Sequence, residues 1–526
     1  MRISFHKISW LFLIVFVMAF SASCSRNETE TSRPNILFIP VDDLRPDLGC
    51  YGNTHIQTPN MNRLAANGIT FTRTYCQQSV CNPSRASLLT GLRPDSIQVW
   101  DLYTSFRETV PEVVTLPQFF KQKGYTTIGL GKTFHNNIPD TLSWTRKPHI
   151  DGYPFDPDAV YLNEENLKIQ EAKIERFKAE GKDRIDQLGH WYVKANAVEI
   201  ADAEDDAYFD GAQTTLAIDI LKNLVKEDKP FFLSVGYYRP HLPFNAPKKY
   251  WDLYERNSLP LATNQFPPEG SPVFATHGDQ ELRSYDDCHD LPWPFEEPWN
   301  EARQRELIHG YYASVSYIDA QVGRLLDELD RLGIGENTIV VLWGDHGWKL
   351  GEHNGWCKMT NYEIDTRVPM IFSGYGAKAK GRKSKALTEF VDIYPTLCEM
   401  AGFSIPPHLQ GTPLTPLLSD PDRAWKNAAF SQFLLGRFGP PLTRQEERMG
   451  YAIRTDRHRY VEWYAWNKET KSRGELLARE LFDHQSDPHE NQNLARNTSQ
   501  ESTMEELSQQ LKQGWRFAKP KTTEPK

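Results

Sequence analysis

Short apolar runs recur along the chain, and polar or glycine residues follow most of them. The runs are Asn35–Val41, Thr126–Leu130, Pro230–Val235, Thr338–Trp343 and Val368–Phe372. Because these runs are nearly continuous rather than alternating, they are typical of strands buried on both faces of a mainly parallel sheet. Pro40 lies inside the first run, and since proline cannot donate to a ladder we expect the strand to fray there.

Helical periodicity fills the intervals between these runs. Thr58–Asn67 has apolar residues at helical spacing and stops at Gly68, and the longer Tyr312–Leu332 stops at Gly333. Glycine is a frequent helix terminator, which supports both ends. The alternation of strands and helices predicts an α/β fold, a large mixed and mostly parallel sheet covered by helices on both faces.

The chain of 526 residues is too long for one compact core, and its pattern changes after about residue 425. Gly450–Arg454 and Tyr460–Tyr464 alternate like antiparallel strands, and a helix is expected from about Glu501 to Phe517. We therefore predict a large domain over residues 34–425 and a smaller α+β domain with an antiparallel sheet over 426–526.

Two stretches carry no assignable motif. Residues 140–206 are polar and weakly periodic, like an insertion with helical pieces, and 265–298 is a long loop rich in Pro, Asp and Glu. Long loops in a compact domain are more often functional than idle, so both are candidates for shaping a binding site.

The N-terminus has the pattern of an export signal. A basic start is followed by the apolar stretch Trp10–Phe20 and by small residues before Cys24. A cysteine there resembles the bacterial lipobox, whose thiol is lipidated, although Ser21 stands where Leu is usual. We expect a signal peptide over 1–23, a tether over 24–33, and an exported protein. It would be a periplasmic or cell-surface lipoprotein held to a membrane through Cys24, or simply secreted if that cysteine is incidental.

Charge and cysteine content narrow the class of function. The formal net charge of −9 predicts no nucleic-acid partner, so a polyanionic substrate would need a local basic pocket. The seven cysteines include no CxxC pair, which argues against a structural zinc site. Their number is low and odd for an exported protein, which argues against a disulfide framework.

Acidic residues stand at the ends of two expected strands. Asp42 and Asp43 follow the first apolar run, and Asp345 and His346 follow the run that ends at Trp343. Ligands of α/β sheets gather beyond the carboxyl ends of the strands. Neighbouring carboxylates repel unless a cation lies between them, and hard oxygen donors favour calcium or magnesium, whereas the imidazole would suit zinc or manganese. An isolated Asp-Asp pair could also be a helix N-cap or a solvated turn.

The segment Cys81-Asn82-Pro83-Ser84-Arg85 precedes a helix-forming run, Ala86–Thr90. This arrangement places Cys81 at a helix N-terminus, where anions are stabilised. The segment resembles the Cys-x-Pro-Ser-Arg signature of type I, formylglycine-dependent sulfatases of the alkaline-phosphatase-like superfamily. Other stretches are most similar to the iduronate-2-sulfatase branch of that family. They are Val41–Pro46, Leu48–Gly52, Gly131–His135, Phe231–Tyr237, Tyr312–Tyr317, Asp345–Trp348 and Leu350–His353.

The resemblance implies that a sulfatase-maturing enzyme oxidises Cys81 to formylglycine. Its hydrate would offer one oxygen to attack sulfur and a second hydroxyl whose collapse to the aldehyde expels sulfate. The resemblance also implies one calcium ion. Most sulfatases carry Asn after the third acidic ligand, whereas this branch carries His, as here, so His346 fits the calcium site that the resemblance implies. The ligands would be Asp42, Asp43, Asp345, His346 and the oxygen at position 81.

Further catalytic roles are implied at matching positions. Arg85 and Lys132 would pair with the formylglycine and sulfate oxygens. His135 would orient the diol and help deprotonate the hydroxyl that collapses. His241 and Lys358 would hold the sulfate, and one of them would protonate the departing sugar oxygen. Considered singly, each residue has an ordinary alternative as a packed histidine or a solvated lysine.

A further group of residues is expected to contact the substrate. Arg45 could pair with a uronate carboxylate or form a salt bridge within its turn. The other candidates for contacting sugar faces and hydroxyls are Asp101, Trp348, Trp356 and Arg437.

The resemblance implies a carbohydrate sulfatase that acts on the end of a sulfated glycan bearing a 2-O-sulfated uronic acid. Three alternatives stay open. They are action on an algal glycan such as the rhamnose sulfate of ulvan, hydrolysis of phosphate or phosphonate esters with zinc, and a surface lipoprotein that binds glycans without catalysis. A glycan-binding lipoprotein would have no need of the catalytic positions. Phosphate and phosphonate ester hydrolases of this superfamily usually use Thr or Ser rather than Cys as nucleophile.

Overall fold

The computed structural model describes residues 33–135, 138–146, 160–181, 193–276, 278–436 and 447–520. The expected export signal, Cys24 and nearly all of the tether lie outside these residues, as does Arg437. Residues 34–526 form one compact unit. In the described part of the chain, no helix combines the length and apolarity needed to cross a bilayer.

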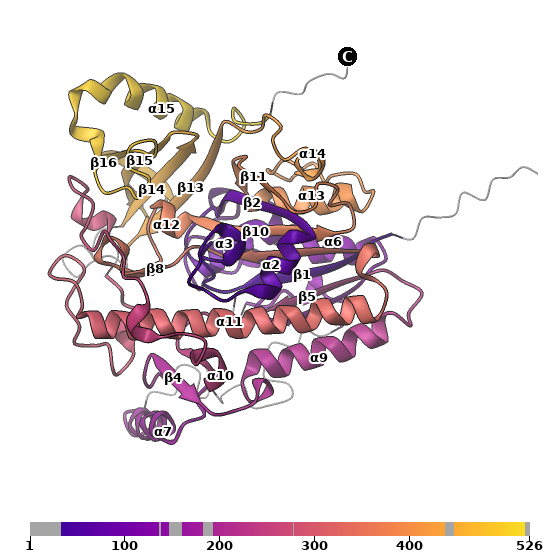
Figure 1. Ribbon diagram of the computed structural model, residues 1–526. Coiled ribbons are helices and arrows are strands. Elements are labelled where there is room, and N and C mark those ends of the chain that lie inside the picture. Colours follow the sequence, from indigo (N-terminus) through magenta and orange to yellow (C-terminus); the bar gives the residue numbers. More distant parts are fainter. Residues whose placement is uncertain are drawn as a thin grey trace, which may run out of the picture. The chain divides into compact units, whose positions relative to one another are not determined.

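The core of this unit is a large mixed sheet (Figure 1). Its strands follow the order β11-β2-β10-β7-β1-β5-β3, with β12 paired to β2. Their bounds are β1 Asn35–Val41, β2 Gly68–Tyr75, β3 Thr126–Gly131, β5 Phe231–Gly236, β7 Thr338–Gly344, β10 Arg367–Gly374, β11 Arg382–Ser384 and β12 Thr388–Glu389. β3, β5, β1 and β7 run parallel, and β10 lies antiparallel between β7 and β2. The four parallel strands therefore bring their carboxyl ends to one edge of the sheet.

All five apolar runs form strands of this sheet, but the expectation at Pro40 was wrong. β1 continues through Pro40 to Val41 and stays in register with β7 throughout. The ladder to β5 runs only as far as Phe38 and resumes at a bridge between Val41 and Tyr237. The missing N–H of proline thus interrupts pairing on one side only, while its carbonyl accepts from Tyr237 N at 2.9 Å.

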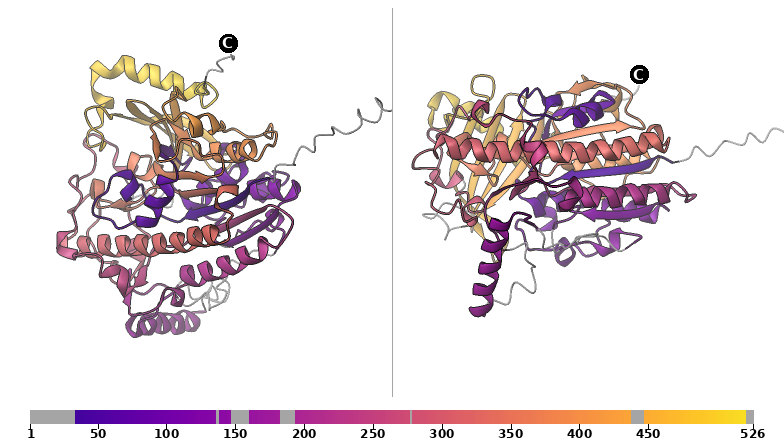
Figure 2. Two further views of the ribbon diagram at one scale, coloured as in Figure 1. Left: turned by 45° about the vertical axis from the view of Figure 1, so that its right-hand side comes forward. Right: turned by 60° about the horizontal axis from the view of Figure 1, so that its bottom comes forward.

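Helices cover both faces of the sheet (Figures 1 and 2). α2 (Pro59–Ala66), α9 (Phe209–Leu224) and α11 (Glu301–Arg331) share one apolar core with one face. α3 (Cys81–Thr90), α6 (Leu116–Gln122), α13 (Ile393–Met400) and α14 (Thr415–Ser419) share another core with the opposite face. The expected helix at Thr58–Asn67 is α2. The expected helix from Tyr312 begins earlier, at Glu301, where Asn300 caps its N-terminus.

The C-terminal part carries a second sheet. Its four antiparallel strands are β13 Ala428–Leu435, β14 Arg448–Thr455, β15 His458–Asn467 and β16 Ser472–Asp483. α15 (Glu501–Gln513) packs on this sheet through Leu507, which shares a core with Ile453 and Tyr460. The boundary predicted after residue 425 falls between α14 and β13.

The two unassigned stretches contact each other. The insertion contributes α7 (Glu164–Ala179) and β4 (Val198–Ala201), and β4 pairs with β6 (Phe244–Pro247). Two of its lysines reach the long loop, since Lys173 pairs with Asp286 and Lys194 donates to Ser284 Oγ at 2.7 Å. The six cysteines that the structure describes form no disulfide with one another.

The carboxylate of Asp319 links α11 to the start of α2. It is buried and accepts from the backbone N–H groups of Asn60 and Met61 at 3.0 and 2.7 Å. Burial raises the pKa of Asp319 from 3.8 to about 6. A carboxyl whose folded pKa is raised stabilises the fold at low pH, and that contribution is lost as the pH rises through the folded value.

We therefore expect Asp319→Asn to gain stability relative to the parent protein as the pH rises from about 4 to about 7, by up to about 3 kcal/mol. Urea unfolding of both proteins across this range measures the difference, in which titrations common to both cancel. A difference that stays constant with pH would show that Asp319 has an ordinary pKa in the folded protein.

Candidate active site

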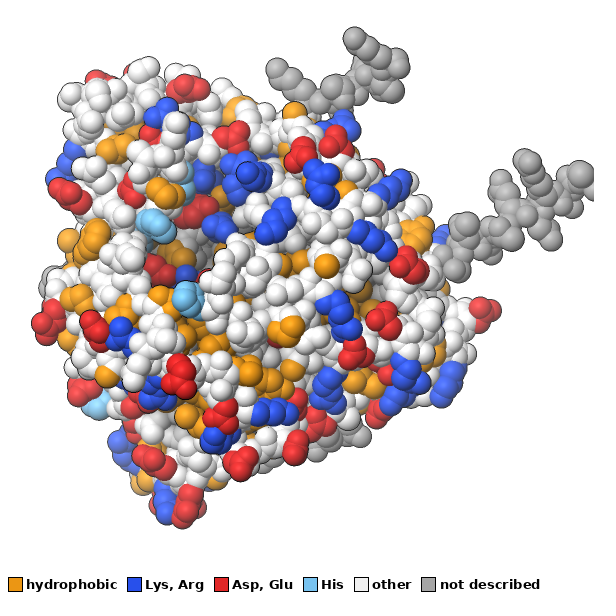
Figure 3. Space-filling view, in the orientation of Figure 1, with side chains coloured by type: hydrophobic (Ala, Val, Ile, Leu, Met, Phe, Trp, Pro, Cys, Tyr) orange, Lys and Arg blue, Asp and Glu red, His pale blue; other side chains and the backbone are white. Residues whose placement is uncertain are grey.

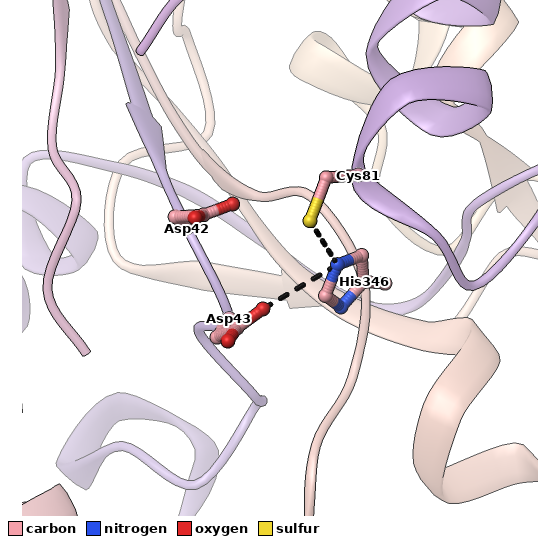
Figure 4. A group of neighbouring side chains, drawn as sticks. All are labelled: Asp42, Asp43, Cys81 and His346. Carbon is pink, nitrogen blue, oxygen red and sulfur yellow. Dashed lines mark hydrogen bonds and ion pairs between the residues drawn. The ribbon is translucent and has the colours of Figure 1, made fainter. Parts of the chain in front are cut away.

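The acidic residues expected at strand ends meet at the carboxyl edge of the large sheet (Figure 4). β1 and β7 are adjacent and parallel, with Val41 opposite Gly344, so Asp42-Asp43 and Asp345-His346 leave the sheet side by side. Asp43 N donates to Asp345 Oδ1 at 3.0 Å. All three carboxylates are fully buried.

Cys81 points at this cluster from the first residue of α3, as predicted from the helix-forming run behind it (Figure 4). Its Sγ lies 3.2 Å from His346 Nε2. Ligand atoms of Asp42, Asp43, Cys81 and His346 all lie within 4.8 Å of one another. Burial, followed by the charge of Asp42, raises the pKa of the Cys81 thiol well above its usual value. An unmodified thiol would therefore stay protonated, which makes it a poor nucleophile.

Two cations neutralise the carboxylates on the α3 side. Arg85 Nη2 lies 3.0 Å from Asp42 Oδ1, and Arg85 Nε lies 2.9 Å from Asp345 Oδ2. Lys132, just beyond β3, pairs with the other oxygen of Asp42. Burial opposes ionisation of Asp42, but the charges of Lys132 and Arg85 outweigh it and hold the Asp42 pKa well below its usual value.

Asp43 is less well compensated. Burial raises its pKa to about 7, and the neighbouring Asp42 carboxylate adds to the effect while Lys358 opposes it.

The ring of His346 is oriented by the backbone. Its Nδ1 lies 3.0 Å from Gly347 O. A carbonyl can only accept, so this contact places the proton on Nδ1 and leaves the lone pair of His346 Nε2 facing Asp43 Oδ1 at 3.4 Å.

This donor set fits a bound cation. Asp43 Oδ1 and His346 Nε2 are two acceptors that face each other, and a positive ion between them would stabilise both. The oxygens of Asp42, Asp43 and Asp345 suit calcium or magnesium, and His346 Nε2 adds one nitrogen.

His241 and Lys358 lie on the other side of the cluster and share a partner that no sequence motif indicated. Lys358 Nζ contacts Asp43 Oδ1 at 2.9 Å and Glu281 Oε2 at 2.8 Å. His241 Nε2 contacts Glu281 Oε1 at 2.8 Å. The only signal for Glu281 was its place in the long loop 265–298, which carries many other acidic residues.

His135 is near the same charges. Burial, followed by the positive charge of Lys132, lowers the pKa of His135 well below its usual value, so the ring is neutral at neutral pH. Its Nδ1 is buried without a hydrogen-bond partner among the described residues. A neutral imidazole with a free polar atom can accept a proton, as the role expected for His135 requires.

The predictions for two tryptophans need correction. Trp348 is fully buried, and its ring lies 4.7 Å from Lys358 Nζ. Trp356 is 2% exposed and stacks on Trp299 at 5.1 Å between ring centroids. Neither ring offers a face to a sugar in this structure. Trp348 instead supports Lys358 through a cation–π contact.

Arg45 and Asp101 both have internal partners. Arg45 Nη2 lies 2.7 Å from Glu352 Oε1, and its Nη1 donates to Trp348 O at 3.1 Å. These contacts favour the salt-bridge alternative for Arg45. Asp101 caps its own loop, and its carbonyl accepts from Asn82 Nδ2 at 2.9 Å, beside Cys81. A direct contact of Asp101 with substrate stays a prediction, as does that of Arg437, which lies outside the described residues.

The ion pair between Arg45 and Glu352 leads to a prediction about the stability of the fold. We expect Arg45→Ala to lower the free energy of unfolding by about 2–4 kcal/mol, because it leaves the mostly buried Glu352 carboxylate without its cation. Urea unfolding checks this value. The double variant Arg45→Ala/Glu352→Ala should lose less than the sum of the two single variants.

Arg382→Ala is the matched control, since it removes an exposed pair with Asp422 and should cost at most about 0.5 kcal/mol. Unchanged stability of Arg45→Ala together with a raised KM would instead assign Arg45 to the substrate.

The surface is hollowed near the segment that follows Asp345 and His346 in the chain. Figure 3 shows a depression near β8 (Lys349–Leu350), with acidic and basic side chains at its bottom and histidines at its rim. The arrangement is a buried nucleophile position next to a potential cation site, surrounded by fixed positive charges. Such a site suits attack on an anionic ester.

Comparison with known proteins agrees with this chemistry. The sequence model of the family described as Sulfatase matches residues 34–403, which is more than half of the chain. The chain belongs to the sulfatase family. It is accordingly a sulfuric ester hydrolase, and both the family resemblance and the fold class expected from the sequence are confirmed. A second family model, described as N-sulphoglucosamine sulphohydrolase, C-terminal, matches residues 351–516.

Individual relatives extend this sulfatase match over most of the chain. Iduronate 2-sulfatase of Mus musculus is 32% identical and the alignment covers 90% of this chain and 92% of the relative. The Homo sapiens iduronate 2-sulfatase is also 32% identical, with 92% and 95% covered. Among solved structures, a protein in complex with its substrate D-glucosamine-2-N,6-O-disulfate superposes with a TM-score of 0.69 at 23% identity, covering 94% of this chain and 100% of that chain. That structure supports the fold alone.

Proposed function

We propose that this sulfatase removes a sulfate ester from a sulfated carbohydrate, using a formylglycine made from Cys81 and one calcium ion. The observation that carries the proposal is the convergence of Cys81 with Asp42, Asp43 and His346 on one point. The cations around that point, Arg85, Lys132 and Lys358, belong to three separate segments of the chain.

The chain's own residues would divide the reaction between two sides of the site. Hydrated formylglycine at position 81 would supply an oxygen nucleophile for sulfur and a second hydroxyl whose collapse releases sulfate. Arg85 and Lys132 are fixed by ion pairs and would stabilise negative charge as it develops on oxygen. Neutral His135 would take the proton of the collapsing hydroxyl.

The leaving-group side is formed by His241 and Lys358. Both would hold the sulfate oxygens, and one would donate a proton to the departing sugar oxygen. Calcium held by Asp42, Asp43, Asp345 and His346 would supply positive charge that lowers the pKa of the oxygen at position 81.

Burial of Cys81 bears on its maturation. The side chain is 2% exposed in the folded protein, so a maturing enzyme would have to reach it before folding is complete. We propose that oxidation precedes or accompanies export, and that Cys24 then anchors the exported protein to a membrane. Loss of membrane association in Cys24→Ala, measured by fractionation, tests the anchor, and unchanged fractionation would favour simple secretion.

We propose a terminal 2-O-sulfated uronic acid as the substrate, because the mouse and human relatives are iduronate 2-sulfatases. Arg45 could bind the uronate carboxylate only by leaving Glu352. A sulfated algal sugar, such as the rhamnose sulfate of ulvan, is the second candidate within the same chemistry.

A desulfation screen tests the proposal. Matured enzyme with calcium is incubated with defined sulfated disaccharides and oligosaccharides of glycosaminoglycan and ulvan type, and released sulfate is quantified. Phosphate and phosphonate monoesters with zinc form the counter-screen. We expect turnover of a 2-O-sulfated uronate at a chain end. Faster turnover of the phosphorus esters, or no turnover of any sulfate ester, would contradict the proposal.

A further inference from the structure

Glu281 is a mostly buried carboxylate inside the site, and the mechanism above does not use it. Each of its oxygens has its own nitrogen partner. Oε1 lies 2.8 Å from His241 Nε2, and Oε2 lies 2.8 Å from Lys358 Nζ. The side chain is only 14% exposed, which makes these contacts stronger than those of a surface pair.

The position of Glu281 is fixed by the elements around it. It precedes a short 3-10 turn, Leu282–Ser284, and Leu282 lies in the core shared with α11. Two residues before it, Asp279 Oδ1 accepts from Trp356 N at 2.9 Å. This bond ties the loop to β9 (Trp356–Cys357), the strand that immediately precedes Lys358.

The insertion supports the same loop from outside. Lys194 donates to Ser284 Oγ at 2.7 Å, and its Nζ lies 4.7 Å from the ring centroid of Tyr285. Asp286 pairs with Lys173 of α7. The two stretches without sequence motifs therefore pack together and present Glu281 to the site.

His241 is held at both ring nitrogens. Its Nδ1 lies 2.7 Å from Leu242 O, and its Nε2 faces Glu281. The backbone contact sets the ring plane, whereas Glu281 sets the direction of Nε2. Lys358 is likewise held between Asp43 and Glu281, with Trp348 beneath its ammonium group.

We propose that Glu281 is a positioning residue of this active site, whose carboxylate holds His241 and Lys358 where they act on the sulfate ester. This inference rests on the proposed function. Without the carboxylate, a flexible lysine and an imidazole free to turn about its side-chain bonds would both have to be ordered by the substrate itself. The ordering cost would then fall mainly on the transition state and to a smaller extent on anion binding.

The test compares Glu281→Gln, Glu281→Ala and Glu281→Asp with the parent enzyme, all matured and supplied with calcium. We expect Glu281→Gln and Glu281→Ala to lower kcat about 10- to 100-fold, with a smaller change in KM. Glu281→Asp should recover part of the loss, because it restores the charge at a shorter reach. Titration calorimetry with inorganic sulfate provides a readout without turnover, and binding should weaken in Glu281→Ala.

Asp286→Asn is the matched control. It removes another carboxylate of the same loop whose partner, Lys173, lies in the insertion and not in the site. We expect kcat and sulfate binding of Asp286→Asn to stay within about three-fold of the parent, a change of less than about 0.7 kcal/mol.

Three outcomes would overturn the inference. The first is a kcat of Glu281→Ala equal to the parent value, and the second is tighter sulfate binding by Glu281→Ala. The third is a loss of activity that matches a loss of folded protein and is shared by Asp286→Asn. Failure of the proposed function is recognised separately, since the parent enzyme itself would then turn over no sulfate ester.

Discussion

Replacing Cys81 with alanine should abolish turnover and leave the fold intact. Alanine cannot be oxidised to an aldehyde, so no hydrate and no oxygen nucleophile can form at position 81. Loss of a nucleophile typically lowers kcat by a factor on the order of 10⁴ to 10⁶. Cys81 is buried at the first residue of α3 and forms no bond that the helix needs, so the substitution should cost little stability.

Kinetics on the best substrate of the desulfation screen measure this effect, and peptide mass spectrometry of the parent enzyme should find an aldehyde in place of the Cys81 thiol. Cys50→Ala is the matched control, because it removes a half-buried thiol outside the site and should keep full activity. Turnover retained by Cys81→Ala, or unmodified thiol in fully active enzyme, would remove Cys81 from the mechanism.

The second large effect is expected at the cation site. Asp345→Ala should abolish binding of the proposed calcium ion and lower kcat at least about 10³-fold, since a metal contributes several kcal/mol of charge stabilisation in the transition state. Asp345 also fixes Arg85 Nε at 2.9 Å and accepts from Asp43 N, so its loss disturbs both sides of the cluster. Chelation of the parent enzyme should give a comparable loss, with calcium restoring activity better than zinc.

Metal content by mass spectrometry and the stabilisation of each protein by added calcium provide readouts besides activity. Asp319→Asn is the control, because it changes a buried carboxylate away from the site and should keep its metal. Asp345→Ala with the full metal content and parental activity would exclude Asp345 as a ligand. Better recovery of activity with zinc than with calcium would show that calcium is not the ion this site uses.

Several elements of the fold could be predicted because their signals are local. The apolar runs that became β1, β3, β5, β7 and β10 are continuous in the sequence, and burial on both faces is visible in their composition. β2 and β13 were missed. β2 begins at Gly68, directly after the C-cap of α2, and its threonines and Arg73 interrupt the apolar residues. β13 begins with alanines, which carry little strand preference.

The sequence by itself determined the chemistry of the strand ends and of the helix start. Asp42-Asp43 and Asp345-His346 follow their strands directly, so the parallel sheet expected from the pattern brings them to one edge, and Cys81 is followed by the helix that orients it. That Cys81 lies at the same edge was decided by the tertiary structure, because β2, the strand before it, was not predicted. Tertiary structure decided which other side chains reach that point. Burial of Trp348 and pairing of Arg45 with Glu352 depend on segments that are remote in the chain. Glu281 could be found only in the folded protein, because no periodicity or motif records which loop packs beside His241 and Lys358.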